Sequence, residues 1–172
     1  MLKAALVLLG AIITTGLLYG QAPPAEHVPG GIQAGASYSF LHLDYSVINP
    51  SAFTAFSDYE LTSHFGAEGE FRTSFSTISE SNYLIGPRAV YPYRGFNPYV
   101  KFLAGLGRFH APGAVGQNGS FGMISYGVGV DYTVDRRITF RLIDYEYQKW
   151  LNFPPRGLQP NVVTVGVAFR IK

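Results

Sequence analysis

The chain has 172 residues, which is enough for one domain with a substantial core. Charged residues make up only 14% of it, aromatic residues make up 15%, and the formal net charge is +2, so the charge gives no support for nucleic-acid binding. The absence of cysteine excludes disulfides, thiolate metal sites and cysteine nucleophiles.

The N-terminal segment has the organisation of a secretory signal peptide. One lysine precedes an uncharged apolar run from Ala4 to Gly20, and small residues and a proline-containing stretch follow. We expect residues 1–20 to form the signal peptide, with cleavage after Gly20 or Ala22, and residues 21–30 to form a flexible lead-in. A retained membrane helix is the alternative, because the apolar run approaches the length that spans a bilayer.

Four strands are predicted in the chain after residue 31, where apolar and polar residues alternate with a period of two. The second is the least regular. It is inferred from a weak internal sequence similarity, because Ser57–Phe71 resembles Gly129–Leu142. Pro87, in the fourth, cannot donate a hydrogen bond to a neighbouring strand, so we expect a bulge or a gap in the pairing there. The four strands span about residues 32–43, 51–59, 64–75 and 80–92.

Four more strands are predicted at about residues 97–109, 120–133, 136–149 and 161–171. The stretch SYGVGVDYTV, residues 125–134, places its tyrosines and valines on one face, and serine, glycine and aspartate on the other. The connections alternate between short turns and longer loops that are rich in glycine, proline or asparagine. Strands of about ten residues with this alternation predict an all-β, up-and-down antiparallel barrel of eight strands that crosses a membrane.

The same alternation also fits a soluble lipocalin-like barrel, in which the apolar face is inside. Three features favour the membrane barrel, whose apolar face is outside, and the third is the set of aromatic residues at the strand ends that is described below. The other face is rich in glycine, serine and threonine, which fit the crowded interior of eight strands. It also carries mid-strand charges of both signs, and an arginine or lysine facing lipid would cost about 2–4 kcal/mol. The predicted ion-pair network in the lumen comprises Glu68, Glu70, Arg72, Arg88, Lys101, Asp131, Arg141 and Arg170.

Aromatic residues crowd the predicted strand ends, which is where membrane barrels carry interfacial aromatic girdles. We therefore expect these side chains to face outward at the two membrane surfaces. The group comprises Tyr45, Tyr59, Phe75, Tyr91, Tyr93, Phe109, Tyr132, Tyr147, Trp150 and Phe153.

Seven segments combine glycine with this alternation: GASYSF, FGAEGEF, LIGPRAVY, NPYVKFLAGLG, YGVGVDY, ITFRL and VGVAFRI. On these segments, residues 31–172 resemble the small eight-stranded outer-membrane β-barrels, the OmpA-like or OmpX-like transmembrane domains. The resemblance implies a monomer in the bacterial outer membrane, surrounded by lipid and lipopolysaccharide. It also implies insertion by periplasmic chaperones and the outer-membrane assembly machinery, which reads the last strand. Here Phe169 and Ile171 keep the alternation, and Lys172 follows them.

These patterns favour a non-enzymatic outer-membrane protein with a structural or surface-interaction role, and with no cofactor or nucleic-acid partner. A narrow channel for ions or small solutes is the alternative. A lipid A-modifying enzyme would need a nucleophile and a base near the outer rim, but the spacing of Ser39, His42 and Asp44 matches no motif of those enzymes. No metal site is expected, because the spacing of the histidines is not that of a metal-binding motif; they are His27, His42, His64 and His110.

Overall fold

The computed structural model describes residues 30–42, 50–74, 79–110, 118–154 and 157–171. The expected signal peptide and nearly all of the expected lead-in lie outside the described residues, as do Tyr45, Phe75 and the candidate acid Asp44. In the described ranges there is no helix with the length and hydrophobicity that crossing a membrane requires.

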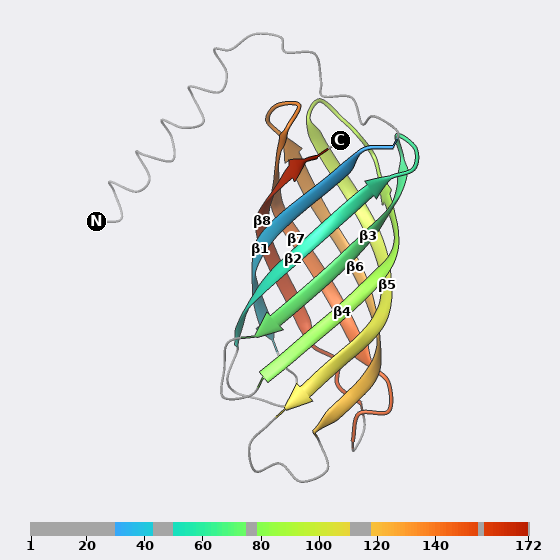
Figure 1. Cartoon of the computed structure of the whole chain (residues 1–172), viewed down its shortest axis with the longest axis vertical. Helices are drawn as coiled ribbons and strands as arrows, with labels where there is room; N and C mark the ends of the chain where they lie inside the picture. The colour runs from blue at the N-terminus through green and yellow to red at the C-terminus, as the bar shows by residue number, and fades with distance from the viewer. Residues whose placement is uncertain (1–29, 43–49, 75–78, 111–117, 155–156, 172) are drawn as a thin grey trace, which may run out of the picture.

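Eight antiparallel strands close into a single barrel (Figure 1). Each strand pairs with its neighbours in sequence, and β8 pairs with β1 to close the ring. The topology is the predicted one, and every strand boundary lies within two residues of the expected position. The strands are β1 (Ile32–His42), β2 (Ser51–Glu60), β3 (Phe65–Ser74), β4 (Ser79–Val90), β5 (Phe96–His110), β6 (Gly119–Thr133), β7 (Ile138–Trp150) and β8 (Asn161–Arg170).

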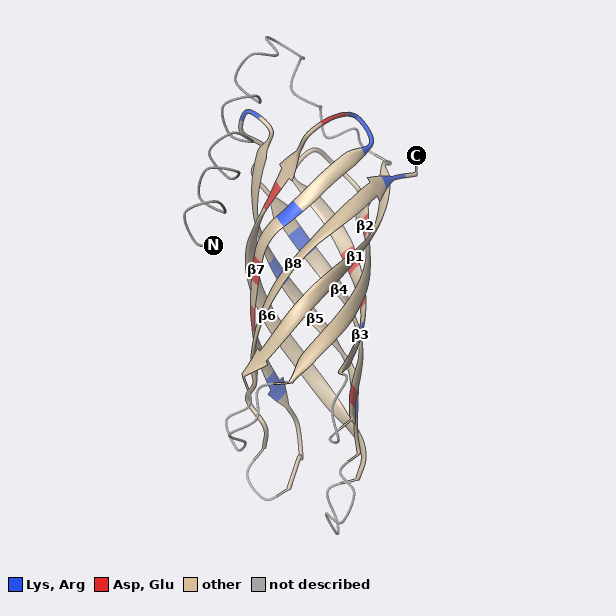
Figure 2. Cartoon of the chain, turned by 90° about the vertical axis from the view of Figure 1, so that its left-hand side faces the viewer, with Lys and Arg blue, Asp and Glu red and all other residues tan. Residues whose placement is uncertain are grey.

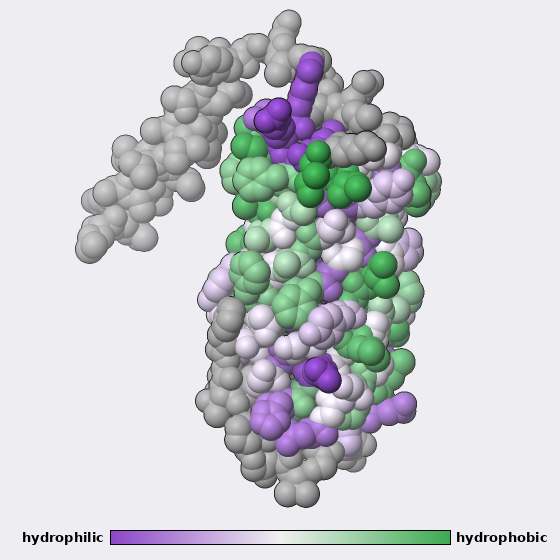
Figure 3. Space-filling model, in the orientation of Figure 1, coloured by the Kyte–Doolittle hydropathy of each residue, from purple (hydrophilic) through white to green (hydrophobic). Residues whose placement is uncertain are grey.

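The outer wall of the barrel carries the apolar side chains. Val100 and Val128 are 55% and 53% exposed, whereas Lys101 and Asp131, on the other parity, are each 5% exposed. In Figure 3, hydrophobic side chains cover much of the wall, and hydrophilic side chains gather toward the two ends. Such a wall is stable in the hydrocarbon of a membrane because its apolar side chains contact lipid. The closed ring of paired strands leaves no backbone edge without hydrogen bonds. The apolar-out arrangement is therefore confirmed, and it is the reverse of a lipocalin-like barrel.

Three short turns lie at one end of the barrel, here called the turn end, together with the start of β1 and the end of β8 (Figure 1). The turn between β6 and β7 is held by the carboxylate of Asp135, which accepts hydrogen bonds from the backbone N–H groups of Arg137 (2.7 Å) and Ile138 (2.8 Å). These bonds lower the pKa of Asp135 below its ordinary value of 3.8. The opposite end, here called the loop end, carries the longer connections.

The pairing of β4 with β5 is interrupted at Pro87. Ile85 pairs with Ala104 and Arg88 pairs with Lys101, but the two residues between them have no partner in β5. The expected gap is therefore confirmed, and its cause is the missing N–H of proline.

A bulge in β7 shifts its register between Arg141 and Asp144. Leu142 and Ile143, which are adjacent in the chain, both face outward with exposures of 46% and 49%. An extra residue in one strand reverses which parity points inward beyond it. As a result, Asp144 and the residues at every second position after it face the lumen.

The aromatic residues divide between the outer wall and the lumen. Tyr59, Tyr91, Tyr93 and Tyr147 are exposed on the wall, and Tyr132 is half-buried there. The expectation of a girdle position is wrong for Phe109, Trp150 and Phe153, which are 3%, 1% and 6% exposed. Phe109 shares the inward parity of Lys101, and Trp150 is turned inward by the bulge in β7. Their rings pack in an apolar cluster at the loop end of the lumen, with Leu84, Leu103, Met123 and Leu158.

Candidate functional site

The lumen is organised in two layers along the barrel. A charged layer occupies its middle, and the apolar cluster around Trp150 occupies the loop end. Figure 2 shows that charged residues of both signs lie along the strands as well as on the turns. The charged layer is where the sequence predicted ion pairs. Its acidic and basic side chains make it the candidate functional site.

Lys101, on β5, lies at the centre of the charged layer. Its Nζ is 2.8 Å from a carboxylate oxygen of Glu68, 3.3 Å from Glu70, 2.5 Å from Asp144 and 2.9 Å from Glu146. The Lys101 side chain is fully buried. An ammonium group taken out of water needs this number of partners, because an unpaired buried charge would be strongly destabilising.

Two arginines extend the layer toward the turn end. The guanidinium of Arg88 is 3.1 Å from Asp58, 3.5 Å from Glu68 and 2.5 Å from Asp131. That of Arg141 contacts the same three carboxylates, at 3.4, 3.1 and 3.4 Å. Both cations are therefore shared between strands that are not neighbours, which ties opposite walls of the barrel together.

Aromatic rings inside the barrel pack against the same two arginines. The guanidinium carbon of Arg141 lies 3.7 Å from the ring centroid of Phe56, and that of Arg88 lies 4.0 Å from the centroid of Tyr99. A cation over an aromatic face is attracted by the ring quadrupole, most strongly where water is excluded. The rings thus fill space around the guanidinium groups and stabilise their charge.

Arg72, on β3, completes the layer toward the loop end. Its guanidinium binds Glu70, lies 2.8 Å from Glu146, and donates from Nε to the hydroxyl of Thr54 at 3.0 Å. Glu146 also accepts a hydrogen bond from Ser125 Oγ at 2.9 Å. The hydroxyl groups of Thr54 and Ser125 thereby provide hydrogen-bond partners for Arg72 and Glu146 in addition to the ion pairs.

The structure brings seven of the eight predicted network residues together, and Arg170 lies apart from them. Arg170 is at the turn end, where its guanidinium is 3.3 Å from Glu60 and its side chain is 16% exposed. Sequence reasoning missed Asp58, Asp144 and Glu146, which belong to the network. Asp58 could have been found by extending the alternation along β2, whereas the other two required knowledge of the bulge.

Carboxylates outnumber cations in this connected network of described residues. It contains Asp58, Glu68, Glu70, Asp131, Asp144 and Glu146 against Arg72, Arg88, Lys101 and Arg141, and none of the ten is more than 6% exposed. The layer therefore has a formal excess of two negative charges when every carboxylate is ionised. Its cohesion depends on each cation being shared.

Two glycines of β6 make room for large side chains of β5. A methyl group at Gly127 would lie 2.6 Å from Cε of Lys101, and one at Gly129 would lie 2.5 Å from the ring of Tyr99. Any larger residue would displace Lys101 or Tyr99, because such distances are far below van der Waals contact. The small, inward-facing row of the stretch SYGVGVDYTV is therefore required by the bulk of its neighbours.

The line where β1 meets β8, here called the seam, is lined inside by uncharged groups except at the turn end, where Arg170 lies. The Ser39 hydroxyl lies 2.8 Å from that of Thr164 on β8 and 2.7 Å from that of Thr54 on β2. The ten residues of the ion-pair network all come from β2 to β7. Away from the Arg170–Glu60 pair at the turn end, the seam is thus held by backbone pairing and hydroxyl contacts.

The candidate enzyme residues are not assembled into a site in the described part of the chain. Ser39 is fully buried among hydroxyl groups in the lumen, whereas His42 is exposed. Within the described ranges, no group of three or more histidine, aspartate or glutamate side chains is placed to hold a metal ion.

Solved structures of several outer-membrane barrels share this fold. Neisserial surface protein A is 15% identical, with a TM-score of 0.60, covering 81% of this chain and 95% of that one. The N-terminal barrel domain of Pseudomonas aeruginosa OprF is 12% identical, with a TM-score of 0.63 and coverage of 83% and 98%. Ail, the attachment invasion locus protein of Yersinia pestis, is 19% identical, with a TM-score of 0.54 and coverage of 83% and 99%. At these identities the likeness shows the fold alone.

No curated protein matches the sequence. The sequence profile of the outer membrane protein beta-barrel domain family matches residues 11–170, which is nearly the whole chain. The closed eight-stranded barrel, its apolar wall and its polar lumen agree with that match. The chain therefore belongs to the outer-membrane protein β-barrel domain family and is a protein of the bacterial outer membrane.

Proposed function

We propose that this protein is a non-conducting, non-enzymatic barrel that serves the outer membrane as a structural element or through surface contacts. The observation that supports this role most strongly is the filled lumen. Lys101 and Arg141 each touch four carboxylates in the middle of the barrel, and the Trp150 cluster lies between them and the loop end. An eight-stranded barrel has an interior that side chains just fill.

An ion would meet two barriers in series on its way through this lumen. In the charged layer it would have to displace side chains that are each held by several partners. In the apolar layer it would have to shed its hydration among Leu103, Met123 and Trp150, which offer no replacement ligands for the ion. The cavity beneath the β2–β3 turn, beside Asp58 and Arg88, has a volume of about 10 Å³, room for one water molecule.

The strands around the β5–β6 hairpin favour a contact role at the loop end. β5 and β6 each have 15 residues, and β7 has 13. About 9–11 residues are sufficient for a tilted strand to cross the bilayer. The additional residues extend β5, β6 and β7 beyond the hydrocarbon at the loop end. In barrels of this kind, the end with the long connections faces outward from the cell. Two of the structural neighbours carry names, surface protein and attachment invasion locus protein, that agree with a surface role.

The remaining features of the proposal concern how the protein reaches the membrane. Residues 1–20 act as a signal peptide that is removed after Gly20 or Ala22, and residues 21–30 are a short lead-in to β1. Periplasmic chaperones and the assembly machinery then insert the barrel as a monomer among phospholipid and lipopolysaccharide. Sequencing the N-terminus of protein taken from outer membranes tests the cleavage site.

Planar-bilayer recording tests the proposed function directly. Purified protein should give no discrete conductance steps, and Arg141→Ala should remain silent because the apolar layer is intact. Steps that change in size with Arg141→Ala would overturn the proposal and support a narrow channel. In parallel, lipid A from expressing cells should keep its mass, and a mass shift that His42→Ala abolishes would show an enzyme instead.

A further inference from the structure

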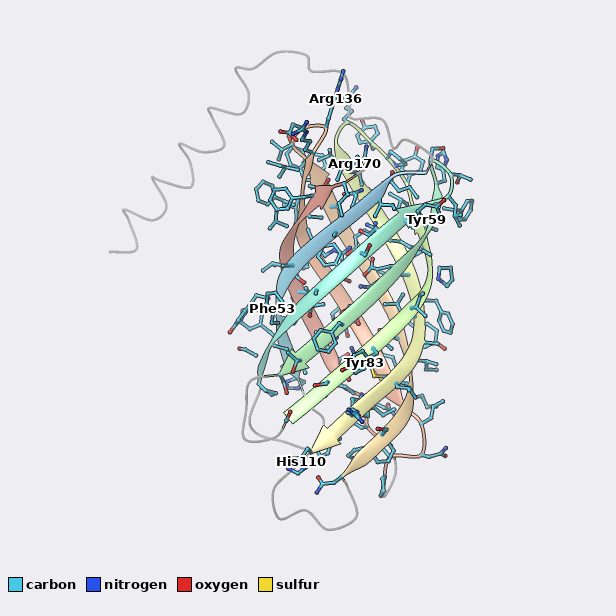
Figure 4. The ribbon with its side chains drawn as sticks, in the orientation of Figure 1. Phe53, Tyr59, Tyr83, His110, Arg136 and Arg170 are labelled. Atoms are coloured by element: carbon cyan, nitrogen blue, oxygen red, sulfur yellow. The ribbon has the colours of Figure 1, made fainter. Side chains whose placement is uncertain are left out.

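Three arginines lie on two neighbouring turns at the turn end of the barrel, which is the periplasmic end in this family. Arg94 is in the β4–β5 turn, and Arg136 and Arg137 are in the β6–β7 turn; all three are exposed. The turns are adjacent, because the N–H of Thr133 donates to the carbonyl of Gly95 at 2.9 Å. In Figure 4, Arg136 projects from the same end as Arg170 and Tyr59, far from His110. We call these three residues the turn arginine cluster.

The turn arginine cluster carries more positive charge than the described residues around it neutralise. Among the described residues, no carboxylate lies within ion-pair distance of Arg94, Arg136 or Arg137. Asp135 is the nearest acid in sequence; its carboxylate accepts hydrogen bonds from backbone N–H groups of its own turn and interacts electrostatically with Arg137, so one negative charge faces three positive ones here. Arg170, by contrast, has Glu60 as its partner. The cluster therefore presents a surplus of guanidinium donors to whatever surrounds this end.

Arg94 occupies a backbone position that does not favour arginine. Tyr93 and Phe96 exchange both backbone hydrogen bonds, at 2.7 and 2.9 Å, around a two-residue turn. Arg94 has φ of 49° and Gly95 has φ of 85°, as a type I′ turn requires. Asparagine, aspartate or glycine is favoured at the first of these positions, because other residues are strained there. An arginine at this position points to a role for its side chain.

The height of Arg94 on the barrel identifies the surroundings of this side of the cluster. Arg94 is one residue beyond the Tyr93–Phe96 bridge, and its guanidinium carbon lies 5.4 Å from the centre of the Tyr93 ring. Tyr91 and Tyr93 are 66% and 56% exposed on the outer wall, in the belt that such rings occupy at the level of lipid headgroups. The short β4–β5 turn therefore holds Arg94 beside the headgroups, and Arg136 projects from the same end of the barrel on the adjacent turn (Figure 4).

We infer that the turn arginine cluster binds the phosphate of an anionic phospholipid in the inner leaflet of the outer membrane. Guanidinium groups bind phosphate oxygens in a bidentate manner, and an anionic lipid supplies negative charge in excess of the one Asp135 carboxylate beside the cluster. The exposed tyrosines beside the cluster would contact the glycerol and upper acyl region of the same lipid. This binding is independent of whether the barrel conducts or contacts other surfaces.

Native mass spectrometry of the purified protein in detergent tests the inference, with phosphatidylglycerol and phosphatidylcholine as competing probes. The wild type should retain phosphatidylglycerol in preference. Each arginine that contacts the lipid should contribute about fivefold to this preference, as expected for a basic residue at an anionic membrane surface. The triple variant Arg94→Asn, Arg136→Gln, Arg137→Gln should abolish it.

Two variants separate lipid binding from folding and from general charge. Arg94→Asn suits the type I′ turn, so it should keep or raise the stability of the barrel while it lowers the lipid preference. Arg108→Gln removes an exposed arginine near the loop end and should leave the preference unchanged. No preference in the wild type, an unchanged preference in the triple variant, or a loss caused only by Arg108→Gln would overturn the inference. So would binding of isolated peptidoglycan that the triple variant loses while its lipid preference persists.

Discussion

Replacing Lys101 with methionine tests whether the charged layer holds the barrel together. The substitution keeps most of the side-chain volume and removes the cation that four carboxylates share within 3.3 Å. Removing one partner of a buried ion pair costs about 3–5 kcal/mol. We expect a loss in this range and not a multiple of it, because each of the four carboxylates keeps a guanidinium partner.

Urea unfolding in detergent micelles measures the loss, with the fluorescence of the single tryptophan, Trp150, as the reporter. Lys149→Met is the matched control, because Lys149 is exposed on the same barrel and its replacement should change stability by at most about 0.5 kcal/mol. Adding Asp144→Asn to Lys101→Met should recover part of the loss by removing one excess carboxylate. Equal stability of Lys101→Met and Lys149→Met would refute the reasoning.

Three further predictions concern other parts of the barrel. Gly107→Ala should cost about 1–3 kcal/mol and shift the emission of Trp150, whose ring fills the space a methyl would need, whereas Gly69→Ala, which meets no neighbour, should leave the emission unchanged. Arg170→Gln should cost less than about 1 kcal/mol in urea unfolding, because its ion pair is partly exposed. The lowered pKa of Asp135 means that its ionised form stabilises the fold above about pH 3.8, and that this contribution is lost as pH falls through the folded-state pKa. The stability difference between wild type and Asp135→Asn should therefore shrink between pH 7 and pH 3, and a constant difference would contradict this.

The strands could be predicted from sequence because alternation with period two is a local property, set by the pleat of each strand. The same property identified Lys101 and Arg141 as inward-facing residues. What could not be predicted is the bulge in β7, because the adjacent apolar pair Leu142 and Ile143 reads as a small irregularity in the pattern. Everything beyond it, including Glu146 and the inward turn of Trp150, depends on that one inserted residue.

The division of the lumen into a charged layer and an apolar layer also could not be predicted from local sequence patterns. Leu103 and Phe109 lie on the same parity as Lys101, so alternation places them inside, but aromatic residues near strand ends are typical of girdles on the outside. The two rules conflict for Phe109. Parity prevails, because a strand that is paired on both sides cannot rotate one side chain to the other face.

The uncharged seam between β1 and β8 has a consequence for how the cylinder can open and shut. If those two strands were to separate, Ser39 and Thr164 would exchange one hydroxyl partner for another or for water, and no residue of the charged layer lies on either strand. The pair of Arg170 with Glu60, already in reach of solvent, links β8 to β2 across this line, and the contact of Arg141 with Asp58 links β7 to β2. Separation at any junction within β2 to β7 would instead pull buried charges apart. The pairing between the first and last strands can therefore form or part with fewer buried charges beside it than the pairing between any two neighbours among β2 to β7.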